Sequence, residues 1–193
     1  MTRAEAAAIF ARILAERKGE RISGTRTLFS DVDPKEWYAS YVSYLEDYNV
    51  IRGYADGTFR PDNNITRSEF VVMCVRFYAL TDEIPDGGKN RFVDVKASSW
   101  AYEEILSAVA MDWIRGYEDS SFRGENNITR AEAVTVVNRV TDRSADADYV
   151  DSNISTLNRF NDLKKSYWAY YEIMEAANDH EAAIVNGSEA WIE

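Results

Sequence analysis

The chain has 193 residues, of which 46% are hydrophobic and 13% aromatic, and its formal net charge at pH 7 is −11. The hydrophobic content suffices for a sizeable core, whereas the acidic charge, with no block of Lys or Arg, argues against a nucleic-acid partner. The sequence contains neither an apolar run long enough to span a membrane nor a segment with the features of a signal peptide. Its one cysteine, Cys74, excludes an intramolecular disulfide and a cysteine-rich metal site.

A long segment occurs twice, 63 residues apart. The first copy, from Phe29, reads FSDVDPKEWYASYVSYLEDYNVIRGYADGTFRPDNNITRSEF, and the second, from Phe92, reads FVDVKASSWAYEEILSAVAMDWIRGYEDSSFRGENNITRAEA. The N-terminal MTRAEAAAIF matches only the end of this unit, and FNDLKKSYWAYYEIMEAAN from Phe160 matches only its beginning. We therefore predict a partial repeat at 1–28, full repeats at 29–80 and 92–143, a partial repeat at 160–180, linkers at 81–91 and 144–159, and a tail at 181–193.

Each repeat is predicted to consist of an opening helix, a polar connector and a closing helix. The chain begins with a closing helix, and two more follow at about 66 and 129. Each closing helix starts with Thr-x-x-Glu, a capping box in which the Thr side chain and the Glu side chain satisfy each other's backbone N–H groups. The three pairs are Thr2 and Glu5, Thr66 and Glu69, and Thr129 and Glu132. Apolar residues then recur at helical spacing, so we expect Cys74 to be an inert core residue.

The opening helices are predicted to start after Asp33, after Ser98 or Ser99, and after Ser166. A tryptophan recurs near each start, and both core packing and stacking against a sugar are open for it. These residues are Trp37, Trp100 and Trp168. An aspartate precedes each tryptophan by six residues and is expected to cap a local turn. These residues are Asp31, Asp94 and Asp162.

The connectors carry turn signals, such as Asp56-Gly57, and every cation in them is an arginine. Gly53 and Gly116 are expected to be helix-stop glycines with positive φ, or to allow close approach of a sugar to bare backbone. The roles of Tyr54 and Tyr117 stay open. The second connector departs from the first, with Ser120-Ser121 for Gly-Thr and Gly124 for Pro; the first full repeat has Ser68 where the second has Ala.

Three arginines, Arg3, Arg67 and Arg130, each occupy the first turn of a closing helix. A positive charge there opposes the helix dipole, at a cost of about 0.3–1 kcal/mol. An anionic ligand would offset this cost, because arginine binds a carboxylate through two parallel hydrogen bonds. The alternative is an ion pair with a carboxylate of a neighbouring repeat.

No catalytic, cofactor or metal site is predicted. Placing Gly57 at the sixth position of a calcium loop puts Arg52, Tyr54 and Asn63 at ligand positions, which is no site. The single histidine, His180, cannot form a His-based metal cluster. The sequence has no Gly-rich phosphate loop, no nucleophile elbow, and no carboxylate pair assignable to a cleft.

The sequence resembles the S-layer homology (SLH) domain over about residues 1–180. The motifs that carry this resemblance are F-x-D-V, the tryptophan that follows it, and I-R-G-Y-x-D-G-T-F-R-P-x-N-N-I-T-R-x-E. The resemblance implies an all-α fold: a single domain, residues 1–193, in which three helix–loop–helix repeats form a pseudo-threefold spindle. It also implies non-covalent anchoring of a secreted protein at the cell surface, through a secondary cell-wall polysaccharide that often carries an acidic pyruvate ketal. The binding grooves would lie between neighbouring repeats, near Thr-Arg-Ala-Glu. The chain would then be a monomeric fragment of a larger extracellular protein, not inserted in a membrane.

The predicted polysaccharide-binding residues combine the positively charged helix starts, their cap partners, the recurring aromatic rings and the connector residues. They are Arg3, Arg67, Arg130, Glu5, Glu69, Glu132, Trp37, Trp100, Trp168, Asp31, Asp94, Asp162, Gly53, Tyr54, Gly116 and Tyr117. For the three glutamates, capping alone is the alternative. For the chain as a whole, the alternatives are a protein–protein or S-layer assembly module that binds no glycan and, as the least favoured, an enzyme.

Overall fold

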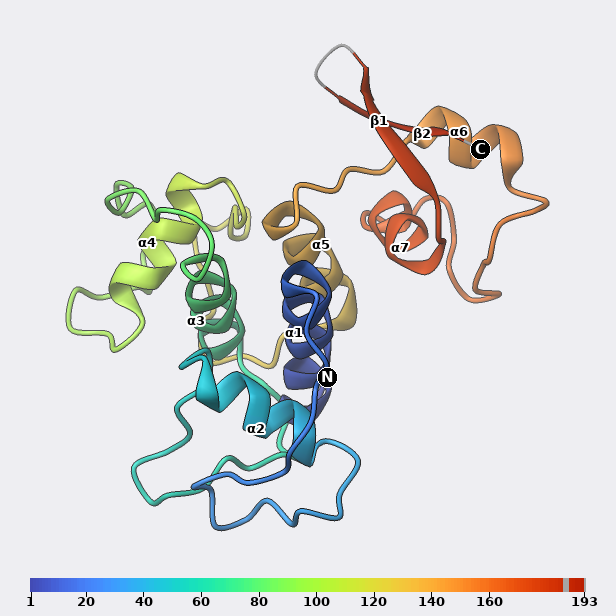
Figure 1. The fold of residues 1–193 in the computed structure, drawn as a ribbon. Helices are drawn as coiled ribbons and strands as arrows, with labels where there is room; N and C mark the ends of the chain where they lie inside the picture. Colours follow the sequence, from blue (N-terminus) through green and yellow to red (C-terminus); the bar gives the residue numbers. More distant parts are fainter. Residues whose placement is uncertain (186–187, 193) are drawn as a thin grey trace. The chain divides into compact units, whose positions relative to one another are not determined.

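The computed structural model describes residues 1–185 and 188–192, and the chain forms two compact units, Met1–Ile128 and Thr129–Glu193 (Figure 1). The described residues form an all-α fold whose only sheet is a two-stranded hairpin, which confirms the predicted fold class. Their elements are α1 (Arg3–Lys18), α2 (Ala39–Asp47), α3 (Arg67–Tyr78), α4 (Tyr102–Ala110), α5 (Arg130–Val140), α6 (Ala147–Asn153), α7 (Tyr170–Ala177), β1 (Glu181–Val185) and β2 (Ser188–Ile192). The single three-repeat domain stays a prediction.

The three closing helices are α1, α3 and α5, and each begins with the predicted capping box. In α1 the Glu5 N–H donates to Thr2 Oγ1, and the Thr2 N–H donates to the Glu5 carboxylate at 2.7 Å. The same two bonds are present in α3 and α5. Cys74 is fully buried in α3, as expected, and burial raises the pKa of its thiol well above the usual value.

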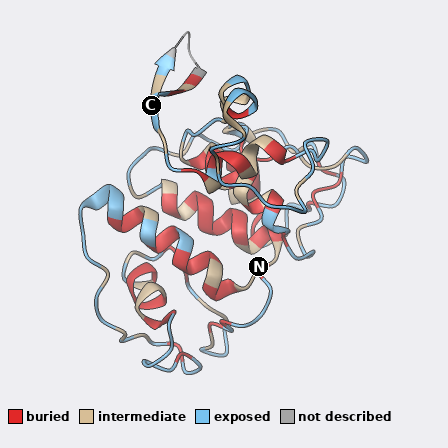
Figure 2. Ribbon diagram, turned by 90° about the vertical axis from the view of Figure 1, so that its right-hand side faces the viewer, coloured by how far each residue is buried: buried red, intermediate tan, exposed pale blue. Residues whose placement is uncertain are grey.

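Each closing helix packs against the opening helix that follows it in the chain. In the first unit α1 packs against α2 and α3 against α4, and in the second unit α5 packs against α7. The helices carry much of the buried surface, and the exposed residues lie mainly on the turns and loops (Figure 2). Some loop side chains are buried as well, among them Phe59 and Phe122. A packed pair therefore joins the end of one sequence repeat to the beginning of the next.

The opening helices begin later than predicted, at Ala39, Tyr102 and Tyr170. Asp33 does not cap a helix. Its side chain accepts a hydrogen bond from the Lys35 N–H at 2.9 Å, and its carbonyl accepts one from Glu36. This is an Asx turn, which offers the backbone an alternative to the helix. The tryptophan of each repeat consequently lies in a turn before the helix.

The predicted linker 144–159 contains a helix, α6, so that prediction was wrong. Asp146 caps it by accepting the Tyr149 N–H at 2.9 Å. Val150 of α6 is fully buried in a small core with Met174 of α7 and Trp191 of β2. The short helix forms because its apolar side chain is covered by residues distant in sequence. Residues 81–91 contain neither helix nor strand, and their role as a linker stays a prediction.

Gly53 has the expected positive φ of 65°, but it does not stop a helix. α2 ends at Asp47, six residues before Gly53, and Asn49 is the left-handed residue that turns the chain there. Gly53 instead lies against an aromatic ring: a Cβ there would be 2.3 Å from Cε1 of Phe29. Gly116 repeats this arrangement, with φ of 75° and the ring of Phe92.

Gly53→Ala is expected to destabilise the first unit more than Gly57→Ala. Both positions have positive φ, which costs alanine about 1–2 kcal/mol. Nothing lies within 4 Å of a Cβ at Gly57, whereas one at Gly53 would also overlap the Phe29 ring, for about 1–3 kcal/mol more. Urea unfolding of the two variants measures the difference, and equal losses would contradict the close packing at Gly53.

Candidate functional site

Each connector is fixed to the start of the preceding closing helix through one phenylalanine. The Arg3 Nε donates to the Phe59 carbonyl at 2.7 Å, and the Asp31 carboxylate accepts the backbone N–H groups of Phe59 and Arg60, both at 2.7 Å. The Phe59 ring stacks on Phe29 with centroids 5.5 Å apart and is fully buried. We call this arrangement of Arg3, Asp31 and Phe29 around Phe59 the connector clasp.

The second connector is held in the same way. The Arg67 Nε donates to the Phe122 carbonyl at 2.9 Å, and Asp94 accepts the N–H groups of Phe122 and Arg123 at 2.7 Å. The Phe122 ring packs against Phe92 at 5.4 Å. The clasp is therefore a property of the repeat and not of one copy.

The connectors also satisfy the helix N-termini. The first two backbone N–H groups of α1, on Arg3 and Ala4, donate to the carbonyls of Asn63 and Pro61 at 2.9 and 3.0 Å. Those of α3 donate to Asn126 and Gly124. Such groups have no partner within a helix, so the connector supplies the acceptors that an anion could have supplied.

Asp31 and Asp94 do not cap local turns, so that interpretation was wrong. Their partners lie 28 and 29 residues further along the chain. The residue type was the signal, because a carboxylate can accept two adjacent backbone N–H groups. Sequence spacing carries no information about which N–H groups these are.

Arg3 is buried, with 6% of its surface exposed, and its NH1 group lies 2.9 Å from Glu69 of the next closing helix. This is the ion pair with a neighbouring repeat that we gave as the alternative to ligand binding. Glu69 also caps α3 and accepts a hydrogen bond from the Tyr54 hydroxyl. Burial raises the pKa of Glu69, but the Thr66 N–H, Tyr54 and Arg3 outweigh it and leave this pKa below its usual value. The structure thus joins Arg3, Glu69 and Tyr54 in one partly buried network.

The outer face of each connector carries a second arginine over the tyrosine ring. Arg60 lies 4.0 Å from the centroid of Tyr54 and pairs with Asp56 at 2.8 Å. In the second connector Arg123 lies 4.0 Å from the Tyr117 centroid and pairs with Asp119 at 3.0 Å. Arg67 also lies over the Tyr117 ring, at 5.1 Å.

The departures of the second repeat preserve the connector. The Ser121 hydroxyl donates to Asp119 at 2.5 Å, as the Thr58 hydroxyl donates to Asp56 at 2.6 Å. Gly124 and Ser68 are in contact, since a Cβ at Gly124 would lie 2.2 Å from Ser68 Oγ. The unusual serine and the unusual glycine are therefore a compensating pair, in which the glycine leaves room for the hydroxyl.

The N-terminus of the third closing helix, α5, differs from those of α1 and α3, because no connector among the described residues binds to it. Arg130 is exposed and lines a pocket of about 670 Å³ with Phe160, Asp162 and Ile173, all within the second unit. Phe160 is 53% exposed, whereas its counterparts in the two clasps are almost fully buried. Glu132, the third capping glutamate, forms the cap of α5 with Thr129.

The tryptophans are exposed, so core packing was the wrong alternative for them. The exposed fractions are 55% for Trp37, 58% for Trp100 and 62% for Trp168. Their place in a turn explains this, because the buried face of each opening helix begins only after them. Sugar stacking is the alternative that the exposure leaves open.

Trp37 belongs to an aromatic surface that also contains Tyr41 and Arg12. The Trp37 and Tyr41 rings meet edge to face at 6.4 Å, and the Arg12 guanidinium lies 5.1 Å from the Tyr41 centroid and donates to its hydroxyl at 3.0 Å. Arg12 is exposed, and no carboxylate among the described residues pairs with it. Sequence reasoning missed Arg12 and Tyr41.

A signal for this surface exists in the repeats. An arginine recurs ten residues after the capping threonine of every closing helix, as Arg12, Arg76 and Arg139. The residue four positions after the tryptophan is Tyr41 in one repeat and Glu104 in the next, where Arg76 lies 3.8 Å from Glu104. The first of these surfaces keeps an arginine without a carboxylate, and the second does not.

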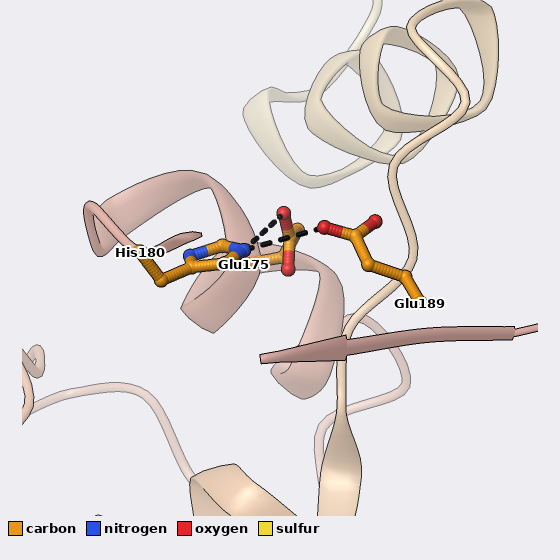
Figure 3. Close-up of side chains that lie close together, drawn as sticks. All are labelled: Glu175, His180 and Glu189. Carbon is orange, nitrogen blue, oxygen red and sulfur yellow. Dashed lines mark hydrogen bonds and ion pairs between the residues drawn. The ribbon is translucent and has the colours of Figure 1, made fainter. Parts of the chain in front are cut away.

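Glu175, His180 and Glu189 converge in the second unit, with ligand atoms within 4.8 Å of one another (Figure 3). Arg143 already fills this cluster: its guanidinium contacts Glu175 at 2.7 Å and Glu189 at 3.0 Å. His180 Nδ1 lies 2.9 Å from the Asn178 carbonyl, which assigns it the proton and leaves Nε2 to accept from Arg143 at 2.6 Å. Burial raises the pKa of Glu175 although Arg143 and His180 oppose this shift. The cluster ties the hairpin to α7.

The repeats match a known family over the segments that carry the clasps. The model of the S-layer homology domain matches residues 28–71 and 91–134. These two segments are S-layer homology repeats. Each matched segment runs from the clasp phenylalanine to the first turns of a closing helix, and so contains the opening helix and the whole connector.

Similar proteins occur among bacterial surface proteins. The chain is 35% identical over its whole length to a cellulosome-anchoring protein of Acetivibrio thermocellus, of which it covers 42%, and 31% identical over its whole length to cell surface glycoprotein 1 of the same organism, of which it covers 8%. It is 33% identical over 51% of its length to the surface layer protein of Brevibacillus choshinensis. The chain thus spans less than half of each of these relatives. No helix among the described residues is long and apolar enough to cross a membrane.

Asp31→Ala is expected to lower the free energy of unfolding by about 1–3 kcal/mol, because it leaves the buried Phe59 N–H without its acceptor. Asp162→Ala is the matched control, since Asp162 accepts no hydrogen bond from the described residues and should change stability by less than about 0.5 kcal/mol. Urea unfolding measures both. A loss at Asp162 as large as at Asp31 would contradict the finding that Asp31 holds a connector whereas Asp162 accepts no hydrogen bond from the described residues.

The carboxyl groups of Asp56 and Asp119 are expected to titrate at a pH of about 2, against about 3.9 for an unperturbed aspartate. The largest causes are the hydroxyls of Thr58 and Ser121, followed for Asp56 by Arg60. Because the folded pKa is lowered, the stabilisation is complete above about pH 4 and is lost as the pH falls through 2. Carboxyl NMR titration measures it: Thr58→Val should raise the pKa of Asp56 alone, and an unchanged value would contradict the assignment.

Proposed function

We propose that this chain anchors a larger protein non-covalently to the bacterial cell envelope by binding a secondary cell-wall polysaccharide. The S-layer homology repeats support this, as do relatives whose names describe anchoring and surface-layer proteins. The location that follows is extracellular, at the cell surface. The proposed role is binding without catalysis, and nucleic acid and membrane lipid are not part of it.

The observation that carries this proposal is the surface formed by Trp37, Tyr41 and Arg12. A sugar ring presents C–H groups that pack on an exposed tryptophan face, and an acidic sugar needs a cation beside that face. Arg12 is held in place by Tyr41 and has donors left for a carboxylate. We therefore propose that this surface binds the acidic sugar of the polymer, such as a pyruvate ketal.

The counterpart on α3 and α4 is a weaker candidate. Trp100 is as exposed as Trp37, but Arg76 has Glu104 within 3.8 Å, and burial together with Arg52 lowers the pKa of Arg76. A carboxylate ligand would meet Glu104 as a like charge. The two surfaces therefore form a natural comparison within one molecule.

The arginines of the two clasps have a supporting role in this proposal. The guanidinium groups of Arg3 and Arg67 hold connector carbonyls from positions that are 6% and 7% exposed. Asp31, Asp94, Glu69 and Tyr54 act with them. Direct contact of these residues with a glycan, predicted from the sequence, stays a prediction.

Trp37→Ala and Arg12→Gln are each expected to weaken binding to purified cell-wall sacculi by about tenfold. Trp100→Ala is the matched control, because it removes an equally exposed ring beside Arg76, which already pairs with Glu104. This variant should change binding less than about twofold. The measurement is a pulldown titration with all variants checked for wild-type circular dichroism.

The same pulldown on sacculi stripped of their non-peptidoglycan polymer identifies the ligand. Loss of binding on stripping supports the polysaccharide. A folded wild-type chain that binds neither preparation would contradict the anchoring proposal and favour a protein-assembly module. Binding that survives stripping would place the ligand in peptidoglycan instead.

A further inference from the structure

We infer that the surface at Trp37 continues along α2 to a second sugar subsite, formed by Lys18 and Glu20 beside Tyr48. This inference rests on the proposed binding of a wall polysaccharide at Trp37, and it concerns how much of that polymer the chain contacts. The acidic sugar binds at Arg12, and a neutral sugar further along the same strand binds between Lys18 and Glu20. The surface is therefore suited to a stretch of oligosaccharide and not to a single sugar ring.

Two cations of α1 lie over two tyrosine rings that α2 presents. Arg12 lies 5.1 Å from the centroid of Tyr41, and Lys18 lies 4.9 Å from the centroid of Tyr48, the residue that directly follows α2. Because these tyrosines are two helical turns apart, they share one face and are separated by about 10 Å along the helix axis. That separation is the length of a short oligosaccharide, so one polymer strand can reach both positions.

The tyrosines on this face of α2 are not required by the fold of the repeat. In the second full repeat, the residues 63 positions after Tyr41, Tyr44 and Tyr48 are Glu104, Ser107 and Met111. The helix there, α4, forms and packs against α3 without any of these rings. The tyrosines of the first repeat are therefore available for a role in binding.

Glu20 is held in position although its side chain is exposed. Its backbone N–H donates to the Ala15 carbonyl at 2.9 Å, and its carboxylate accepts the hydroxyl groups of Tyr44 at 2.7 Å and Tyr48 at 2.8 Å. These hydroxyls, Tyr44 first, lower the pKa of Glu20 and keep it ionised near neutral pH. A carboxylate has about four lone-pair positions, so this one can also accept from a ligand. Because the protein already orients it, binding costs less conformational entropy.

Lys18 supplies the hydrogen-bond donors of this subsite. It is exposed, and no carboxylate among the described residues forms an ion pair with it. A hydroxyl group fits between an ammonium and a carboxylate that are not paired, because it accepts from the first and donates to the second. Neutral sugars carry several such hydroxyls, whereas the carboxylate of an acidic sugar would meet Glu20 as a like charge. The subsite is therefore selective for a neutral sugar.

The test uses the full chain and wall polysaccharide released from sacculi, purified and partially hydrolysed into fragments of increasing length. Calorimetric titration of Lys18→Gln should show binding of the long fragments weakened about tenfold, because hydrogen bonds to a charged group are lost. Binding of the isolated acidic sugar should change less than about twofold, since it contacts only the first position.

Arg17→Gln is the matched control. It removes the same charge from the neighbouring residue, whose guanidinium lies over the Phe77 ring of α3 instead of beside α2. Binding of the long fragments should change less than about twofold in this variant. Equal weakening by Arg17→Gln and Lys18→Gln would overturn the inference, because it would indicate general attraction between charges and no defined subsite.

Glu20→Gln distinguishes a neutral sugar from an acidic one at this position. Glutamine keeps an acceptor for the tyrosine hydroxyls but removes the negative charge. Binding of the long fragments should weaken, because hydroxyl groups bond more strongly to a carboxylate than to an amide. Tighter binding would contradict the neutral sugar, since it would mean that Glu20 repels an anionic group of the ligand.

Failure of this inference and failure of the anchoring proposal give different results. If wild type and Lys18→Gln bind the long fragments equally, the second subsite is refuted while binding at Trp37 stands. If the folded wild-type chain binds no fragment of any length, the anchoring proposal is contradicted and the second subsite with it.

Discussion

The connector clasp is the interaction on which the fold of the first unit depends. A connector has little regular structure of its own, so its backbone polar groups need partners elsewhere. Arg3, at the start of the closing helix, donates to the Phe59 carbonyl, and Asp31, ahead of the opening helix, accepts the N–H groups of Phe59 and Arg60. The same connector then supplies carbonyls to the N-terminus of the preceding closing helix. The backbone polar groups of an irregular loop thereby find partners in the rest of the unit.

The clasp also explains why arginines occupy the first turn of helices. An arginine there opposes the dipole of its own helix, but in α1 and α3 it binds the carbonyl of a connector, and in α1 it also pairs with a glutamate of the next repeat. The local cost is offset by long-range contacts. An unfavourable residue at a helix start can therefore mark a tertiary contact as well as a ligand.

The repeats are equivalent in sequence but are used differently. Two helix starts are covered by connectors, whereas no connector among the described residues covers the third, at Arg130. Two tryptophan-bearing surfaces of the first unit differ in one residue, Tyr41 against Glu104, and this decides whether a neighbouring arginine faces a carboxylate. Repetition thus supplies several copies of a surface, and a single difference in sequence determines which copy has an arginine without a carboxylate partner among the described residues.

The sequence by itself determined the all-α class, the three closing helices and their capping boxes, because these features depend on residues within one turn of each other. It also indicated which side chains recur at equivalent positions of the repeats. Only the tertiary structure decided what these side chains contact. Asp31 binds N–H groups 28 and 29 residues away, Trp37 is exposed because its helix begins after it, and α6 forms because Val150 is covered by residues from α7 and β2. Contacts between distant segments depend on how the helices pack, and this is not encoded in the spacing of any one motif.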